Sequence, residues 1–396
     1  MTQQSAYIVS IARTPIGSFS GSLANLTAID LGAKAVEGAL QRAGIAPEEV
    51  EEIYFGNVLS ANLGQNPARQ IALKAKLPQS VSATTVNKVC ASGLKAVEFG
   101  AKSIMLGLAD VVVVGGTESM TNTPHYLPSA RGGIRYGDST IVEGIARDGL
   151  LDAYDKIAMG IFADETAEEN SITREQQDEF AINSYQRAID ATNAGLLKDE
   201  IIPVEVPQGR KLPPVVVEKD EEIGKFNPEK LKKLNAAFTA NGTVTAGNAS
   251  SINDGAAALV LVSQAKYEQL KLQGSAFKIV SFADGAHQPQ RFTTAPSIAV
   301  PKALTRAGLD ASQIDFYEIN EAFSAVALAN SKILNLNQDK VNVFGGAVGI
   351  GHPLGCSGAR ILVTLCNVLN KKGGKYGCAA VCNGGGGASS LIVEKI

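Results

Sequence analysis

The segment Asn87–Gly93, which reads N-K-V-C-A-S-G, lies where a predicted strand meets a predicted helix. Residues 82–89 are rich in valine and threonine, which is typical of a β-strand. The apolar side chains that follow recur at spacings of three and four, which predicts a helix with one buried face. They are Leu94, Val97, Ala101, Ile104, Met105 and Leu108. Cys90 therefore stands at a helix start, where unpaired N–H groups and the helix dipole favour a thiolate. This position suits a nucleophile, although a single cysteine is more often a buried core residue.

Strands and helices alternate on both sides of this segment. The predicted strands cover residues 6–11, 52–58 and 110–116, and the predicted helices cover residues 30–43 and 66–75. This alternation predicts an α/β fold with a largely parallel or mixed sheet that helices cover on both faces.

The same pattern returns near the C-terminus. Three pairs of segments recur in the same order at nearly one offset, which is 264 and 265 positions for the first two pairs and 268 to 269 for the third. The pairs are Ala39–Ile45 with Ala303–Leu309, Ser92-Gly93 with Ser357-Gly358, and Val111–Gly116 with Ala379–Gly385. We interpret them as an internal duplication that produces two α/β halves of shared topology.

A different kind of chain separates the two halves. Residues from Thr117 to about Thr243 are more polar, and Thr173–Ala191 predicts a helix with a capping box between Thr173 and Gln176. This stretch is predicted to be an insertion that covers a site or makes subunit contacts, and Thr243–Val262 is predicted to return to an apolar helix and strand. The predicted boundaries are 1–120 plus 244–272 for the N-terminal half, 121–243 for the insertion and 273–396 for the C-terminal half.

Composition excludes several classes of protein. The 396 residues carry a net charge of −3, so the chain as a whole has no excess of positive charge that would attract nucleic acid or an anionic membrane. Five cysteines and three histidines show no zinc spacing and predict reduced thiols. No apolar run reaches membrane-spanning length. Residues 1–7 are polar and lack arginine, so we expect neither a signal nor a transit peptide, and the C-terminus is no peroxisomal tripeptide. A cytoplasmic location is expected.

Three further places could join Cys90 in one site. His352 lies in the glycine-rich loop Gly349–Gly358, before a helix predicted to start near Ser357. Cys382 ends a buried strand that runs into Gly384 and its neighbours, and Asn320 ends the strand 316–319. A core histidine, a buried cysteine and a helix cap are the structural alternatives. Two cysteines and a histidine at strand ends instead favour acyl transfer, in which one cysteine forms a thioester and the others move protons. Backbone N–H groups at the glycines would form an oxyanion hole.

The sequence resembles the thiolases, and within them the biosynthetic acetyl-CoA C-acetyltransferases of fungi and other eukaryotes, over essentially its whole length. Seven motifs carry the resemblance: N-K-V-C-A-S-G (87–93), G-G-T-E-S-M (115–120), N-G-T-V-T-A-G-N-A-S (241–250), N-D-G-A-A-A (253–258), N-E-A-F (320–323), G-H-P-L-G-C-S-G-A-R (351–360) and C-N-G-G-G (382–386). The resemblance implies the thiolase fold, two α/β halves in five α-β-α-β-α layers with an inserted loop domain. It also implies a homotetramer, a dimer of dimers.

The resemblance also implies a role for each residue of the site. Cys90 would carry the acetyl group, His352 would activate it, and Cys382 would remove the α-proton of a second acetyl-CoA. His352 and a water held by Asn320 would stabilise the enolate, and the N–H groups of Cys90 and Gly384 would bind the oxyanion. Coenzyme A, which is substrate and product and the only cofactor-like group required, would lie along the insertion. Positions that match family contacts to it are Leu150, Met159, Phe238, Ala246, Ser250, Ile252, Ala322 and Phe323.

One residue departs from the family pattern. The family usually has His-Met-Gly where this chain has Ala158-Met159-Gly160, and that histidine lies beside the pantetheine. We therefore expect weaker coenzyme A binding than in relatives.

Some members of the family bind potassium, and five positions of this chain match that site: Tyr185, Ala246, Gly247, Ala249 and Val348. A potassium ion and a simple buried tyrosine are both compatible with these residues.

The implied reaction joins two acetyl-CoA into acetoacetyl-CoA and CoA, at the start of mevalonate, isoprenoid and sterol synthesis. The alternative within the family is a degradative 3-ketoacyl-CoA thiolase of broader chain length, which the short-chain motifs disfavour. A ketoacyl synthase would lack Cys382. An inactive lipid carrier or scaffold would be expected to lose Cys90, His352 or Cys382, and all three are present.

Overall fold

The computed structural model describes residues 4–209, 212–270, 272 and 274–396. Residues 1–3, where the predicted N-terminal half begins, and residue 273, where the predicted C-terminal half begins, lie outside the described residues.

Ten strands of the described chain form one mixed sheet with two similar parts. The first part has the order β4-β3-β5-β10-β1, with β2 beside β10, and the second has the order β12-β13-β14-β11. The strands of the first part are β1 (Ala6–Arg13), β2 (Gly17–Ser18), β3 (Glu52–Gly56), β4 (Ser82–Val86), β5 (Val111–Ser119) and β10 (Asn253–Ser263). Those of the second part are β11 (Phe277–Ala286), β12 (Phe316–Ile319), β13 (Tyr376–Asn383) and β14 (Gly387–Lys395). The two parts join where β1 pairs with β11, through Tyr7–Lys278 and Ile8–Phe277.

The two parts repeat one topology, which confirms the predicted duplication. In the first, β3 is parallel to β4 and β5, and β10 is antiparallel to β5 and β1. In the second, β12 is parallel to β13, and β14 is antiparallel to β13 and β11. Helices α1 (Ala28–Ala43) and α8 (Pro296–Ala307) both end at a left-handed glycine, Gly44 with φ 64° and Gly308 with φ 65°. The repeated sequence at residues 39–45 and 303–309 therefore marks equivalent helix ends.

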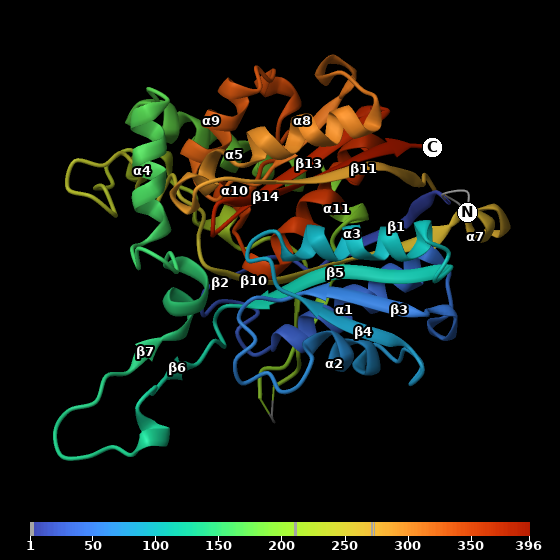
Figure 1. Ribbon diagram of the computed structural model, residues 1–396, viewed down its shortest axis with the longest axis horizontal. Helices are drawn as coiled ribbons and strands as arrows, with labels where there is room; N and C mark the ends of the chain where they lie inside the picture. Colours follow the sequence, from blue (N-terminus) through green and yellow to red (C-terminus); the bar gives the residue numbers. More distant parts are fainter. Residues whose placement is uncertain (1–3, 210–211, 271, 273) are drawn as a thin grey trace.

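Helices and sheet parts alternate in five layers (Figure 1). Helices α1 and α2 (Pro67–Lys74) pack on the outer face of the first part, and α8 packs on the outer face of the second. Helices α3 (Ser92–Met105) and α11 (Leu354–Lys372) contact each other between the two parts, inside one apolar core. Every residue of α11 from Leu354 to Leu369 is buried, as a central helix requires. The layers are those of the predicted α-β-α-β-α fold.

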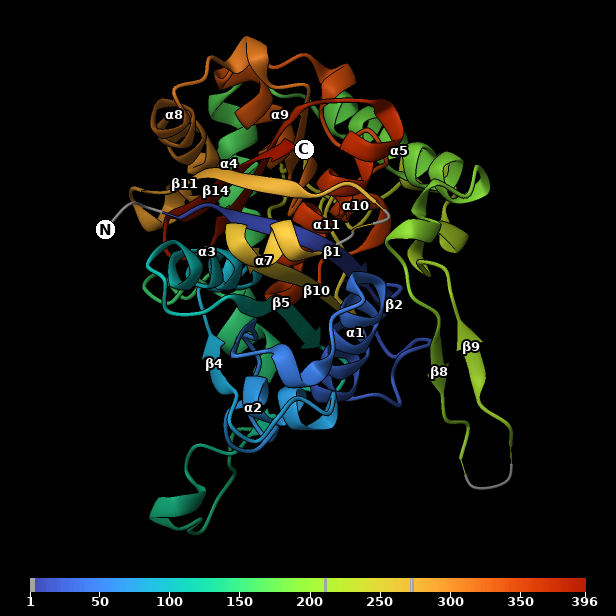
Figure 2. The same cartoon turned by 90° about the vertical axis from the view of Figure 1, so that its right-hand side faces the viewer.

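The segment between the two halves packs beside the second part of the sheet, and two of its hairpins project away from the body of the protein. Helices α4 (Met159–Glu169) and α5 (Arg174–Asn193) contact α9 (Ser324–Ile333), and α5 begins with the predicted capping box of Thr173 and Gln176. The hairpins β6–β7 and β8–β9 project from the body (Figures 1 and 2). Their strands are β6 (His125–Tyr126), β7 (Val142–Glu143), β8 (Val204–Val206) and β9 (Val215–Val217). The remaining short helices are α6 (Pro228–Leu231), α7 (Gln264–Gln269) and α10 (Ala347–Ile350).

Two predicted elements differ from the structure. Residues 243–252 form irregular chain around one turn at 246–248 rather than a helix, because the side chain of Asn248 bonds locally to the N–H of Thr245 (2.8 Å) and the carbonyl of Thr243 (3.1 Å). Helix α11 begins at Leu354 rather than near Ser357, directly after Pro353, whose missing N–H costs nothing at a helix start. None of the described helices is long and apolar enough to cross a membrane.

Candidate functional site

Cys90 lies in a tight, strained turn between β4 and α3. Val89, the residue before it, has a φ of 49°, a left-handed conformation that is unusual for a β-branched side chain. The Ser92 hydroxyl closes the turn, because it accepts the N–H of Lys88 (2.8 Å) and donates to the carbonyl of Val89 (2.6 Å). Such strain persists only where the surroundings enforce it, and it is common at functional sites.

His352 is fixed from two sides at the start of α11. Its N–H donates to Oδ1 of Asn253 at 3.0 Å, and its Nδ1 lies 2.5 Å from Oγ of Ser357. The Ser357 hydroxyl donates its own proton to the carbonyl of Pro353 at 2.9 Å. Ser357 therefore accepts from Nδ1–H, which leaves Nε2 of His352 as a proton acceptor.

Cys382 and Gly384 approach Cys90 from the end of β13. The backbone N–H groups of Gly384 and of Cys90 itself lie close enough to the Cys90 thiol to lower its pKa. The Cys382 thiol is buried and is close enough for the charge of Cys90 to raise its pKa further, after the larger effect of burial. The two sulfur atoms and two N–H donors thus share one end of the site, where an oxyanion could be stabilised.

Asn320 faces the imidazole from the end of β12. Its Nδ2 lies 3.5 Å from both ring nitrogens of His352, and its Oδ1 is buried without a hydrogen-bond partner among the described residues. A buried, uncommitted amide oxygen beside the imidazole is suited to hold a polar group of a ligand or a water.

The resting site is electrically neutral at its nucleophile. Desolvation by the surrounding protein raises the pKa of Cys90 to about 12, although the two N–H donors oppose this rise. Burial, with a smaller contribution from Arg360, lowers the pKa of His352 to about 3. The expectation that the helix start favours a thiolate is therefore corrected, because desolvation outweighs the N–H groups. A thiol beside a neutral imidazole can pass its proton during attack on a carbonyl.

A cavity of about 500 Å³ ends at this group. Cys90, His352 and Gly384 form part of its wall, and Cys382 packs behind Met159 and Phe292 of the same wall. All eight residues matched to coenzyme A contacts line the cavity: Leu150, Met159, Phe238, Ala246, Ser250, Ile252, Ala322 and Phe323. Ala158 lines it too. The wall is mostly apolar with a few polar groups, which suits a flexible acyl-bearing chain.

Local backbone features shape this cavity. Leu150 ends a π-helical turn, Ala146–Leu150, an element that is frequent at functional sites. Phe238 packs edge-on against Phe323, with ring centroids 6.0 Å apart. A Cβ at Gly160 would lie 2.3 Å from the Phe238 ring, so the glycine allows that ring to close the wall.

Two of the five residues matched to a potassium site line a second, smaller cavity of about 150 Å³. Tyr185 and Gly247 line this cavity, and Val348 packs in the same apolar cluster as Tyr185. Ala246 and Ala249 line the large cavity instead. Burial, and then the charge of Glu222, raise the pKa of Tyr185 to about 12, so its phenol stays neutral. Neutral oxygen atoms such as backbone carbonyls can coordinate a potassium ion.

Sequence reasoning missed the residues that hold the loops of the site. Ser357 orients His352, Asn253 accepts its N–H, and Glu118 accepts N–H groups of Val58 and Gly355. The available signal was a polar residue in an otherwise apolar strand, namely Glu118 in β5 and Asn253 in β10. Every residue of these two strands is buried, so each polar side chain there needs a hydrogen-bond partner.

The chain is similar to known proteins over nearly its whole length. The family described as thiolase, N-terminal domain matches residues 6–265, and thiolase, C-terminal domain matches residues 274–395. The cytosolic acetyl-CoA acetyltransferase ERG10 of Gibberella zeae is 60% identical over 98% of this chain and 98% of its own. The acetyl-CoA acetyltransferase of Candida albicans is 59% identical over 98% of this chain and 97% of its own. The crystal structure of the Acat5 thiolase of Ascaris suum in complex with coenzyme A is 44% identical, has a TM-score of 0.94, and covers 99% of this chain and 100% of its own.

Proposed function

The chain belongs to the thiolase family, and we propose that it is an acetyl-CoA C-acetyltransferase that works through an acetyl group on Cys90. The reaction is 2 acetyl-CoA ⇌ acetoacetyl-CoA + CoA. One observation carries the assignment: two thiols, an imidazole whose Nε2 can accept a proton and two N–H groups meet at the end of a cavity of about 500 Å³.

In the first half-reaction, Nε2 of His352 accepts the thiol proton of Cys90 as Sγ attacks the acetyl carbonyl. The N–H groups of Cys90 and Gly384 stabilise the oxyanion that forms. When the C–S bond of the thioester breaks, the CoA sulfur takes a proton from Cys382. The site then holds acetyl-Cys90, a protonated imidazole and a Cys382 thiolate.

In the second half-reaction, the Cys382 thiolate removes a proton from the methyl group of a second acetyl-CoA. The imidazolium of His352 and a water on Asn320 stabilise the enolate oxygen. The enolate carbon attacks acetyl-Cys90, and the Cys90 sulfur leaves and recovers its proton from His352. Both cysteines and the imidazole return to their starting states, so the protons balance in this ping-pong cycle.

Coenzyme A is proposed to lie in the large cavity. The eight wall residues matched to family contacts are mostly apolar and would surround the pantetheine chain. The Ascaris relative was crystallised with coenzyme A, which supports this placement.

Residues 121–243 are proposed to be an inserted loop domain with roles in ligand binding and assembly. The β6–β7 arm exposes Ile134 and Tyr136, with 57% and 109% relative accessibility. Exposed apolar side chains on a projecting arm support the proposed homotetramer, which light scattering of the purified protein would test.

For the cellular setting, we propose the cytoplasm and the first step of mevalonate, isoprenoid and sterol synthesis. The Gibberella relative is named cytosolic, which supports this setting.

Thiolysis of 3-ketoacyl-CoA esters of increasing length tests the proposed substrate. We expect strong activity with acetoacetyl-CoA and little with 3-ketohexanoyl- or 3-ketooctanoyl-CoA. Comparable activity on all three would assign the chain to the degradative branch, and no activity on any would contradict the enzymatic function.

A further inference from the structure

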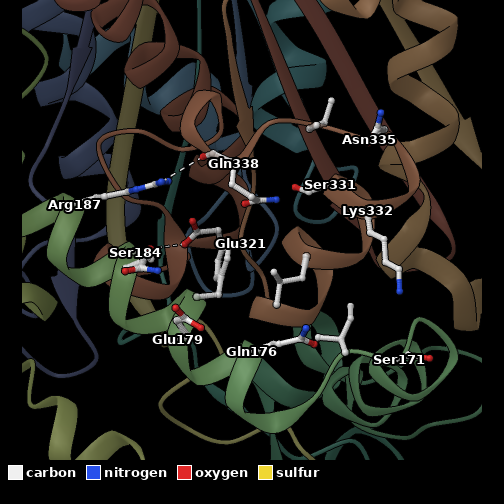
Figure 3. Close-up of a pocket in the computed structure, with 15 residues that line it drawn as sticks. Ser171, Gln176, Glu179, Ser184, Arg187, Glu321, Ser331, Lys332, Asn335 and Gln338 are labelled. Atoms are coloured by element: carbon white, nitrogen blue, oxygen red, sulfur yellow. Dashed lines mark hydrogen bonds between the residues drawn. The ribbon is translucent and has the colours of Figure 1, made fainter.

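Glu321, the residue after Asn320, is buried behind the active site and has no part in the mechanism above. It lines a further cavity of about 500 Å³ between α5 and α9, which we call the α5–α9 cavity. Figure 3 shows its side chain at the centre of this cavity, with Ser184 of α5 reaching toward it. Its position joins two loops that carry active-site groups.

One contact of Glu321 leads to the loop of Asn320. Oε1 of Glu321 accepts Nδ2 of Asn342 at 2.8 Å. The same Asn342 side chain accepts the N–H of Ile319 and donates to its carbonyl, both at 2.8 Å. Since Ile319 directly precedes Asn320, this pair fixes the end of β12 against Glu321.

Two other contacts lead to the loop of His352. Oε2 of Glu321 accepts the N–H of Val348 at 3.0 Å and the hydroxyl of Ser184 at 2.6 Å. Oγ of Ser184 in turn accepts the N–H of Gly346 at 3.1 Å. Gly346 and Val348 open the short helix that ends two residues before His352. The carboxylate therefore holds the start of this loop.

The fit is close and specific for a carboxylate. A Cβ at Gly346 would lie 2.2 Å from the carboxyl carbon of Glu321, so only a glycine lets the loop approach. All three partners of Glu321 donate, which requires an acceptor at both oxygens. Burial raises the pKa of Glu321, and the hydrogen bonds from Ser184, Asn342 and Val348 oppose that rise.

We infer that Glu321 is a positioning residue that holds Asn320 and His352 in register for the enolate step. This inference rests on the proposed function. Glu321 touches no reacting atom and acts through the two loops that it joins. A displacement of about 1 Å at reacting groups costs on the order of 10²-fold in rate, so a clamp at this point controls turnover.

The substitution Glu321→Gln, in the full-length chain, tests the clamp with little change in shape. Glutamine keeps one of the two acceptor oxygens and replaces the other with an NH₂ donor. This donor must face either Asn342 or the pair Ser184 and Val348, which are themselves donors, so at least one hydrogen bond is lost. We expect kcat for acetoacetyl-CoA thiolysis to fall on the order of 10²-fold. KM should change by less than about threefold, because Glu321 does not line the substrate cavity.

Two hydroxyls that line the α5–α9 cavity give matched comparisons. Ser184→Ala removes the link to Gly346 and should lower kcat in the same direction by a smaller factor. Ser331→Ala removes a buried hydroxyl of the same cavity that has no partner among the described residues, and kcat and KM should equal those of the wild type. Ser184→Ala carries the test if Glu321→Gln does not fold.

The rate of Cys90 alkylation by iodoacetamide against pH separates positioning from general stability. Measured well below the unfolding temperature, the Glu321→Gln profile should differ from the wild type, because the Cys90–His352 pair is displaced. An unchanged profile together with wild-type kcat overturns the inference, and so does a fall in kcat that Ser331→Ala shares. A wild type without thiolysis activity would instead contradict the proposed function.

Discussion

Ala158→His introduces the side chain that the resemblance to the thiolases leads us to expect at this position, and its effect on substrate binding can be worked out from the cavity. Ala158 lies on the wall, at the start of α4, with no side-chain hydrogen bond and an extended backbone (φ −67°, ψ 139°) that any residue can adopt. An imidazole at this position would point a polar group into a cavity of about 500 Å³ whose wall is otherwise mostly apolar.

The expected gain is one hydrogen bond to the pantetheine chain. A net hydrogen bond is worth about 0.5–1.5 kcal/mol, which lowers KM for acetyl-CoA by about 2- to 12-fold. The gain applies equally to substrate and transition state, so kcat should stay within about twofold of the wild type. Cys90, His352 and Cys382 are not altered by the change.

Steady-state condensation and thiolysis rates against acyl-CoA concentration measure both constants. Ala158→Leu is the matched control, because it fills similar space without a polar group and should not lower KM. An unchanged KM in Ala158→His refutes the reasoning. An equal decrease in Ala158→Leu would refute it too, because the gain would then come from apolar contact.

Three further outcomes are expected. Arg13→Met leaves the fully buried carboxylates of Glu200 and Asp220 without their guanidinium. It should therefore lower the free energy of unfolding, measured in urea, by about 3–5 kcal/mol. A loss below about 1 kcal/mol would contradict the stabilising role of these two ion pairs. Gly116→Ala would place a Cβ 2.1 Å from the carbonyl oxygen of Gly355, so it should lower the free energy of unfolding by about 1–3 kcal/mol and slow thiolysis. Gly224→Ala is the control, because a Cβ at Gly224 would meet no atom within 4 Å, and this variant should match the wild type. Equal effects of the two substitutions would refute the packing argument. Thiolysis should be faster in potassium than in sodium buffer, and Tyr185→Phe should abolish the difference; equal rates in both salts would exclude a potassium site.

Local patterns predicted the parts of the fold that depend on local chemistry. The helix that ends at Gly44 and its repeat that ends at Gly308 could be found because a left-handed glycine is needed at both ends. The duplication was readable for the same reason, since equivalent turns keep equivalent residues. The helix predicted within 243–262 failed because the Asn248 side chain, a long-range partner of Asp178, satisfies the backbone of that segment.

The sequence predicted which residues form the site but not the contacts that hold them in place. Cys90 follows β4 and Cys382 lies near the end of β13, as their strand patterns predicted, whereas His352 follows the short helix α10 and not a strand. The support of His352 by Ser357 was missed, because it depends on where α11 begins. The role of Glu118 was missed as well, because it bonds to Gly355, 237 residues away. The neutral thiol could not be foreseen, because desolvation is a property of the assembled core and not of the motif.

The most direct test of the proposed reaction is to locate the acetyl group in the Cys382→Ala variant after incubation with acetyl-CoA. This variant keeps Cys90, His352 and the two N–H groups, but it lacks both the acid that protonates the CoA sulfur in the first half-reaction and the base of the second. Acetylation of Cys90 should therefore be slower than in the wild type and should stop at the acyl-enzyme. Peptide mass spectrometry should therefore find one acetyl group on the peptide that contains Cys90, and the label should be absent in Cys90→Ala. An acetyl group on another residue, or none in an otherwise folded Cys382→Ala protein, would contradict the acyl-enzyme on Cys90.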